Sequence, residues 1–363
     1  MNAIKRILCT PFTDGKFNLK NKVVMNPVPT GFVKNGIISS ENIEFYRLRA
    51  KSVGMIIVGA VNISDPTATN NSKVPDISDQ NMKIWKNVTD NIHEEDCKVL
   101  AEIWHSGSSR AFGNPEYANN VSSPSGVVGN KKIGEALKPI EIEDIISEFV
   151  IAARNAKKAG FDGIDIHGAH GSLIHDFLDK ETNKRTDGYG IENRTKFAEE
   201  IIKRCREAVG EDFIILFRLS NYKMYDLSAK LTDSSKELRS IVQKISDSGV
   251  DGFDCSALNF DEDIFENEKG NLAYWAKVIS AKPVIITGGV GSKSPLYKDI
   301  PKMIAQISSN PQMSYKSFEI EKPQITDQEK LIKGYEAENF DLVAFGRPLL
   351  INENWVKELK EKL

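Results

Sequence analysis

Short runs of valine and isoleucine recur along the chain without alternating with polar residues. Runs of this kind are typical of strands buried on both faces, as in a parallel sheet. They predict eight strands, at residues 22–25, 55–61, 99–105, 163–167, 214–219, 252–256, 283–287 and 342–346.

Helical periodicity occupies the intervals between these runs. It predicts helices at 40–53, 142–159, 193–209 and 233–248, the first with Ser39 and Ser40 as candidate caps. A strand followed by a helix, eight times over, predicts an α/β fold, a (β/α)8 TIM barrel, formed as one domain over residues 1–363. A doubly wound sheet is the alternative, but no G-x-G-x-x-G follows an early strand.

Three segments depart from the repeating unit. Residues 12–17, with Asp14-Gly15 at their centre, predict a hairpin that plugs the bottom of the barrel. Residues 106–140 and 291–326 predict long loops after the third and seventh strands, at the barrel mouth. We interpret 106–140 as a partial lid over the site. The alternative is a surface loop without a binding role, or one that contacts another subunit. The role of 291–326 is left open.

Composition excludes several classes of function. The net charge is −3 and the charges are interleaved, so the sequence has no basic patch of the kind that binds nucleic acid or an anionic membrane. No apolar run reaches the roughly 20 residues of a membrane span, and residues 1–10 lack the core of a secretory signal. The four scattered cysteines form no C-x-x-C pair, so neither a zinc site nor an iron–sulfur cluster is expected. Free thiols in a chain of this size are typical of a reducing compartment, so we expect a cytoplasmic location. The partner expected is a small-molecule substrate, and a homo-oligomer is left open.

The last two strands end in glycine-containing turns. These are Thr287-Gly288-Gly289-Val290 and Phe345-Gly346-Arg347-Pro348. Glycines let backbone N–H groups close on a phosphate, and an arginine adds a bidentate cation. Barrels often bind phosphate at these two loops, so FMN, PLP or a sugar phosphate would fit. No lysine ends a strand, which argues against PLP.

Two histidines and an arginine end the fourth and fifth strands. His167 and His170 are spaced to donate hydrogen bonds to a negatively charged oxygen. A metal site that adds His105 is the weaker alternative, because no further ligand is evident. Arg218 needs an anionic or electron-rich partner in the barrel mouth. That partner could be a ligand, or Arg218 could simply form an ion pair with Asp165 or Glu102.

At this point the chain resembles the Old Yellow Enzyme family of FMN-dependent ene reductases. The most specific stretch is HGAHGSLIHDFLDKETNKRTDGYGIENR at 167–194. Supporting pieces, in the family's order, are LKNKVVMNP, IWHSG, SSPS, FRLS and DLVAFGRPLL, at 19–27, 103–107, 122–125, 217–220 and 341–350.

The resemblance implies a bound FMN that NAD(P)H reduces in a ping-pong cycle. Its expected contacts are Asn26, Pro27, Val28, Pro29, Ala60, Glu102 and Arg218 along the flavin, and Gly289, Val290, Gly346 and Arg347 at the phosphate. It implies that His167, His170 and Arg218 are catalytic, with the two imidazoles gripping a substrate oxygen. An electron-poor alkene, a quinone or a nitro compound is the expected acceptor. Because the chain continues about one helix past Arg347 without a cysteine cluster, we expect electrons to pass through FMN alone.

The chain departs from the family pattern around the flavin head. Ser172 stands where the family has the tyrosine that protonates the α carbon, so water, Tyr222 or Tyr225 would have to supply the proton. Glu102 replaces a glutamine, and a carboxylate there is expected either to have a raised pKa or to pair with Arg218. Pro29 replaces a threonine or cysteine and offers no donor.

The loop at 187–192 is two residues shorter than is usual in the family. Together with the changes around the flavin head, this motivates an alternative function, a flavin-binding barrel with weak or no ene-reductase activity. A metal-dependent barrel hydrolase is the third hypothesis.

Overall fold

The computed structural model describes residues 3–69, 71–112, 121–290 and 328–362. Eight strands form a closed barrel in which each strand is parallel to both neighbours. In chain order they are β3 (Val23–Met25), β6 (Met55–Asn62), β7 (Lys98–Trp104), β12 (Gly163–His170), β13 (Ile214–Lys223), β14 (Gly252–Ser256), β15 (Val284–Thr287) and β16 (Leu342–Phe345). The predicted barrel and its eight strands are confirmed.

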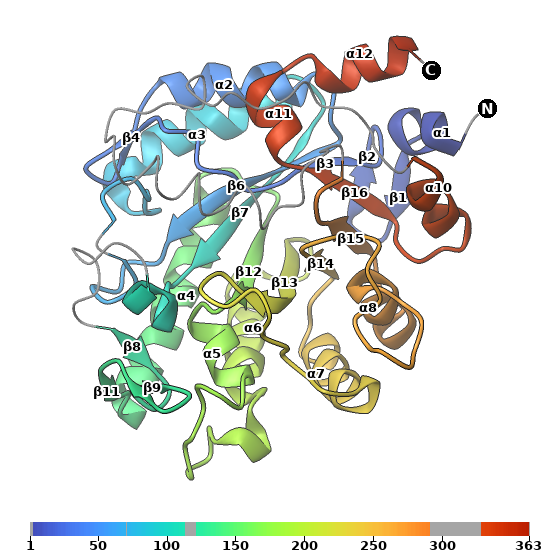
Figure 1. Cartoon of the computed structure of the whole chain (residues 1–363). Helices are drawn as coiled ribbons and strands as arrows, with labels where there is room; N and C mark the ends of the chain where they lie inside the picture. The colour runs from blue at the N-terminus through green and yellow to red at the C-terminus, as the bar shows by residue number, and fades with distance from the viewer. Residues whose placement is uncertain (1–2, 70, 113–120, 291–327, 363) are drawn as a thin grey trace.

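Helices surround the barrel, as Figure 1 shows. They are α2 (Glu41–Ala50), α3 (Asp79–His93), α4 (Pro139–Lys158), α5 (Leu173–Leu178), α6 (Lys196–Val209), α7 (Ser235–Asp247), α8 (Leu272–Ser280), α10 (Gln328–Glu336), α11 (Arg347–Ile351) and α12 (Trp355–Lys362). The four predicted helices are present, each shortened or shifted by a few residues. Ser40 occupies the N-cap position of α2, as predicted, and its side chain makes no cap hydrogen bond.

The hairpin closes the bottom of the barrel as expected. Strands β1 (Phe12–Asp14) and β2 (Phe17–Leu19) pair antiparallel around Gly15, whose positive φ of 54° suits the first central position of a tight turn. Phe17 and Leu19 are buried against Val24, Leu100 and other residues that fill the lower barrel. This apolar layer seals the barrel below the polar groups at its mouth.

A helix that the sequence reading missed lies at the N-terminus. Helix α1 (Ala3–Cys9) buries Ile4, Ile7 and Leu8 and contacts α10 and α12, so the two ends of the chain lie side by side (Figure 1). The apolar residues of α1 are three and four apart, a spacing that could have revealed it. No described helix has the length and apolarity needed to cross a membrane.

The loop after β7 carries structure of its own. It contains the 3-10 helix η1 (Gly107–Phe112) and the short strands β8 (Ser122–Ser123), β9 (Val127–Val128), β10 (Lys131–Lys132) and β11 (Glu135–Ala136). Strand β8 pairs with β11, and β9 pairs with β10. Ser109 of η1 lines the cavity at the barrel mouth, so this loop borders the site. The loop at 291–326 lies outside the described residues.

Candidate active site

A cavity of about 520 Å³ opens at the carboxyl ends of the barrel strands. It is lined by all of the predicted site residues, namely Asn26, Pro27, Val28, Pro29, Ala60, Glu102, His167, His170, Arg218, Gly289, Val290, Gly346 and Arg347. Its volume lies in the range of cofactor and small-molecule sites, about 300–1,000 Å³. The barrel therefore gathers residues from seven strand ends into one place.

One end of the cavity suits a phosphate. Gly288 and Gly289, which follow β15, have positive φ angles of 149° and 70°. A Cβ on Gly288 would lie 2.7 Å from the carbonyl oxygen of Ala257, so only glycine fits this turn. Gly346 and the buried Arg347 follow β16, the strand that pairs with β15. Backbone donors and one guanidinium thus face the same space, which is the donor set that a phosphate monoester needs.

The other end of the cavity contains a buried ion-pair cluster. Arg218 Nη1 donates to Glu102 Oε1, and Arg218 Nε lies 3.1 Å from Asp254 Oδ2. The Thr287 hydroxyl donates to Asp254 Oδ1 at 3.0 Å. Burial opposes the charge on Glu102, but Arg218 and His167 outweigh it and lower the pKa of Glu102 to about 2. Of the two expectations for Glu102, pairing with Arg218 is the one the structure shows.

Asp254 was missed by the sequence reading, which offered Asp165 as the second partner of Arg218. The two residues that meet, Arg218 and Asp254, are register partners on β13 and β14. Inward-facing side chains on paired parallel strands lie close together, so the register decides this contact. The sequence could have revealed this pair, because Asp254 lies in the strand predicted next after that of Arg218, at a matching position.

Asp165 lies below this cluster and is fully buried. Burial raises its pKa well above the ordinary range, and the nearby carboxyls of Asp254 and Glu102 raise it further. The raised pKa favours the neutral form of Asp165, which limits the excess negative charge in the barrel.

Replacing Asp165 with asparagine is expected to stabilise the protein at pH 8 but not at pH 4. A carboxyl with a raised folded-state pKa favours folding below its unfolded pKa of about 3.9 and costs stability as the pH rises above it. An amide has no such cost, so Asp165→Asn should gain about 1 kcal/mol or more at pH 8, at about 1.4 kcal/mol per pKa unit. Urea unfolding at the two pH values measures this. A gain of equal size at both pH values would show that folding does not raise the pKa of Asp165.

His167 and His170 lie next to each other, with ring centroids 5.0 Å apart. His167 Nδ1 is 2.8 Å from Glu102 Oε1, and His170 Nε2 is 2.8 Å from Ser256 Oγ. Burial lowers the pKa of His170 well below its usual value, and the charges of His167 and Arg218 lower it further. His170 is therefore a neutral ring, held in a left-handed backbone conformation with φ of 63°.

The residues that depart from the family pattern have clear contacts. The Ser172 hydroxyl donates to the carbonyl oxygen of His167 at 3.0 Å. The Thr30 hydroxyl donates to Asn42 Oδ1 at 2.7 Å and is not on the cavity wall, so Thr30 does not replace the donor that Pro29 lacks. Tyr222 lines the cavity, whereas the Tyr225 hydroxyl lies 3.2 Å from Ser108 Oγ.

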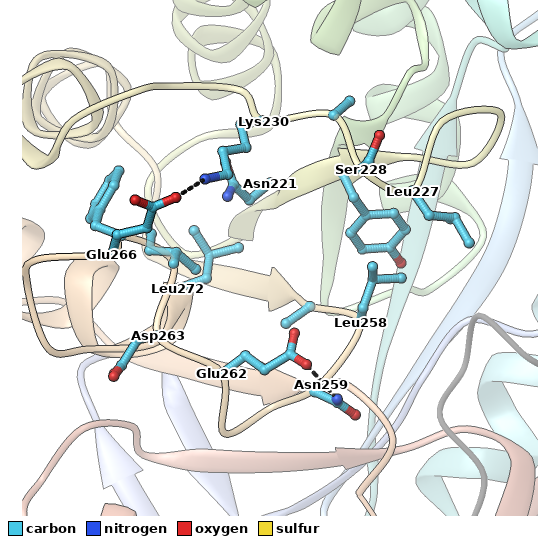
Figure 2. Close-up of a pocket in the computed structure, with 15 residues that line it drawn as sticks. Asn221, Leu227, Ser228, Lys230, Leu258, Asn259, Glu262, Asp263, Glu266 and Leu272 are labelled. Carbon is cyan, nitrogen blue, oxygen red and sulfur yellow. Dashed lines mark hydrogen bonds and ion pairs between the residues drawn. The ribbon is translucent and has the colours of Figure 1, made fainter.

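A second cavity, of about 360 Å³, adjoins the first and shares Tyr222 with it. Figure 2 shows its polar groups turned toward one another: Lys230 faces Glu266, 4.0 Å away, and Asn259 donates to Glu262 at 2.6 Å. Lys230 and Glu266 thus pair with each other, while Asp263 of the same lining pairs with Lys269 outside it. It offers neither the imidazoles nor the phosphate-type turns of the main cavity.

His105, which the metal hypothesis requires, belongs to a different cluster. Its Nε2 lies 3.1 Å from Thr67 Oγ1, and its Nδ1 accepts from the N–H of Gly107. It does not line the cavity with His167 and His170. Within residues 3–69, 71–112, 121–290 and 328–362, no three His, Cys, Asp or Glu side chains are grouped to hold a metal.

A family model described as the NADH:flavin oxidoreductase / NADH oxidase family matches residues 7–305. The chain belongs to this family. The description of this family is of flavin-dependent oxidoreductases, the class that the sequence predicted. The resemblance to Old Yellow Enzyme is confirmed by the same match and by the fold.

Two relatives illustrate the range of the family. The NADH oxidase of Thermoanaerobacter brockii is 30% identical over 371 aligned residues, which cover 96% of this chain and 50% of that protein. The 12-oxophytodienoate reductase 2 of Arabidopsis thaliana is 34% identical over 233 residues, 60% of this chain and 62% of that protein. The chain thus spans less than two thirds of each relative's length.

Solved structures support the fold. An Old Yellow Enzyme homologue from Zymomonas mobilis matches with a TM-score of 0.75 over 98% of this chain and 92% of that one, at 22% identity. Morphinone reductase in complex with tetrahydroNAD matches with a TM-score of 0.72, at 23% identity. At these identities the likeness establishes the shared barrel.

Proposed function

We propose that this flavoprotein uses NAD(P)H to reduce an electron-poor alkene, a quinone or a nitro compound in a ping-pong cycle. The observation that carries the proposal is a single cavity with a phosphate-type end and an opposite end where two imidazoles lie beside a buried guanidinium. The first end suits the cofactor's phosphate, and the second suits a substrate oxygen that becomes negative during reduction.

The residues present fit FMN. Gly289, Val290, Gly346 and Arg347 would hold the phosphate, while Asn26, Pro27, Val28, Pro29, Ala60, Glu102 and Arg218 would surround the ring. When bound, FMN would supply hydride transfer between NAD(P)H and the acceptor. Arg218 would favour a reduced, anionic ring, and ionised Glu102 would partly cancel its positive charge.

The two histidines would act together on the acceptor, but they differ in which ring nitrogen carries hydrogen. His167 and His170 would both donate to the acceptor oxygen and draw electron density from the conjugated bond. Neutral His170 can donate only from the nitrogen that carries its hydrogen. If Tyr222 donates to Ser256 and Ser256 donates to His170 Nε2, that hydrogen is on Nδ1.

An anaerobic reductive titration tests the proposal. Addition of NADPH or NADH to the yellow protein should bleach the flavin, and an enone, a quinone or a nitro compound should then restore the colour. Bleaching by neither nicotinamide would contradict the proposal and favour a flavin-binding protein without this activity.

Replacing Arg347 with alanine is expected to weaken FMN binding about 10- to 100-fold. A hydrogen bond to a charged group contributes about 1.5–3 kcal/mol, and the glycine turns would remain in place. Fluorescence titration of the apoprotein with FMN measures the dissociation constant. Arg47→Ala, at a partly exposed position on α2 far from the cavity, is the matched control and should bind FMN as the wild type does. Equal affinity of the Arg347 variant would place the phosphate elsewhere.

A further inference from the structure

Reduction of a conjugated alkene consumes a proton as well as a hydride, and the usual proton donor is replaced here. Ser172 is buried, and its hydroxyl is already committed to the carbonyl oxygen of His167 at 3.0 Å. An aliphatic hydroxyl is also a far weaker acid than a phenol, whose pKa is about 10. Ser172 therefore positions the turn after β12 and supplies no proton.

The nearby phenols are poor substitutes. The Tyr225 ring stacks on Phe112 with centroids 4.2 Å apart, and Tyr225 is not part of the cavity wall. Tyr222 is on the wall, with its hydroxyl 3.4 Å from Ser256 Oγ. Burial raises the pKa of both phenols, which makes each a weaker acid than an exposed tyrosine.

His167 is in a different state because its partner is Glu102. A carboxylate has only lone pairs, so at a separation of 2.8 Å His167 Nδ1 must carry the hydrogen between them. A neutral His167 would then present a lone pair at Nε2, which repels an acceptor oxygen. His167 can hold a substrate oxygen only as an imidazolium, with Glu102 as its counter-ion. A glutamine at position 102 would impose no such requirement, because an amide also donates.

Charged and titratable groups from several elements surround His167. The titratable and charged groups that face it are Glu102 from β7, Asp165 and His170 from β12, Arg218 from β13, Asp254 from β14 and His175 from α5. His170 and His175 are neutral because burial lowers the pKa of each, that of His175 to about 4. Arg218 pairs with both Glu102 and Asp254, and His167 Nδ1 meets the same oxygen of Glu102 that Arg218 does. The carboxylate of Glu102 is thus in place as the counter-ion of a charged His167.

We propose that His167, paired with Glu102, is the acid of this enzyme and that it protonates the oxygen of the substrate, so that the product leaves as an enol. The inference rests on the proposed function. The β carbon receives hydride with its two electrons, the C=C π pair shifts to the bond between the α carbon and the carbonyl carbon, and the C=O π pair moves to oxygen. That oxygen takes the proton from His167 Nε2, which leaves a neutral imidazole that water reprotonates.

The enol becomes a ketone in solvent, where water can protonate the α carbon from either face. The expected product of a 2-substituted cyclic enone is therefore racemic at the α carbon. A 3-substituted enone should still give one enantiomer, because the protein presents only one face of the β carbon to the hydride.

The closing experiment reduces 2-methylcyclohexenone and 3-methylcyclohexenone with the flavin-loaded protein and NAD(P)H, with chiral analysis at early times. A racemic 2-methyl product beside a single 3-methyl enantiomer supports the proposal. A single 2-methyl enantiomer overturns it, and loss of that selectivity in Tyr222→Phe would identify Tyr222 as the acid instead. Absence of turnover with both enones, together with no bleaching by NAD(P)H, would overturn the proposed function and this inference with it. Turnover with the wrong stereochemistry overturns the inference alone.

A second measurement is independent of turnover. Nitrogen-15 NMR of histidine-labelled apoprotein should show both His167 nitrogens protonated at pH 7, with His170 as the neutral neighbour. In Glu102→Gln this doubly protonated form should be lost at pH 7, because an amide cannot act as its counter-ion. A wild-type His167 with one unprotonated nitrogen at pH 7, or a doubly protonated form that persists in Glu102→Gln, would overturn the proposal.

Discussion

Replacing Arg218 with methionine is expected to lower the free energy of unfolding by about 3–5 kcal/mol, the usual cost of removing one partner from a buried ion pair. Methionine leaves Glu102 and Asp254 buried without their shared cation. Both carboxyls would then have to take up protons or admit water. Urea unfolding at pH 7, followed by fluorescence and circular dichroism, measures the loss.

Two further variants make the Arg218 prediction specific. The triple variant Arg218→Met, Glu102→Gln, Asp254→Asn should recover much of the lost stability, because it leaves no uncompensated charge. Arg204→Met breaks a half-exposed pair with Glu143 and should cost less than about 1 kcal/mol. If the Arg218 variant were as stable as the Arg204 variant, the cluster would not be an interdependent set of buried charges.

Replacing His167 with alanine is expected to slow reduction of the acceptor about 10²- to 10⁴-fold, the usual contribution of a positioned acid. The variant loses both the donor to the substrate oxygen and the counter-ion of Glu102. Arg218 still pairs with Glu102, so the fold and FMN binding should survive. Stopped-flow reoxidation of the pre-reduced protein by an enone isolates this step from reduction by NAD(P)H.

The control for His167→Ala is His93→Ala. His93 lies on α3, partly exposed, with Nε2 2.8 Å from Asp162, and it is remote from the cavity. Its variant should reoxidise at the wild-type rate. A His167 variant that reoxidises within tenfold of the wild type would remove His167 from the chemistry and place the acid on another group.

The barrel could be predicted from local pattern because each strand is buried on both faces and so appears as an uninterrupted apolar run. The same rule explains where the prediction stopped short. Strands β12 and β13 continue to His170 and Lys223, beyond the predicted ends at 167 and 219. Their last residues are polar, since His170 lines the cavity and Lys223 pairs with the buried Asp179, and polar residues interrupt the apolar signal.

The site was predictable in part for a related reason. Strand ends meet at one mouth in any (β/α)8 barrel, so glycine turns and polar residues at those ends are expected to converge. This reasoning and the resemblance together predicted that Glu102, His167, Arg218 and Arg347 share one site, and all four line the same cavity. The contacts within the cavity depend on strand register and side-chain direction, which no local pattern reports.

The sequence by itself therefore determined the barrel, the family and the set of residues at its mouth, because these follow from periodicity, turn chemistry and strand order. Only the tertiary structure decided that Arg218 pairs with Glu102 and Asp254, that Ser172 is turned back to the backbone, and that His167 meets a carboxylate. Residues 102 and 218 lie 116 positions apart, and closure of the barrel brings them into direct contact. In that buried place a charge is stable only beside its opposite, so the neighbours of each group set its protonation state.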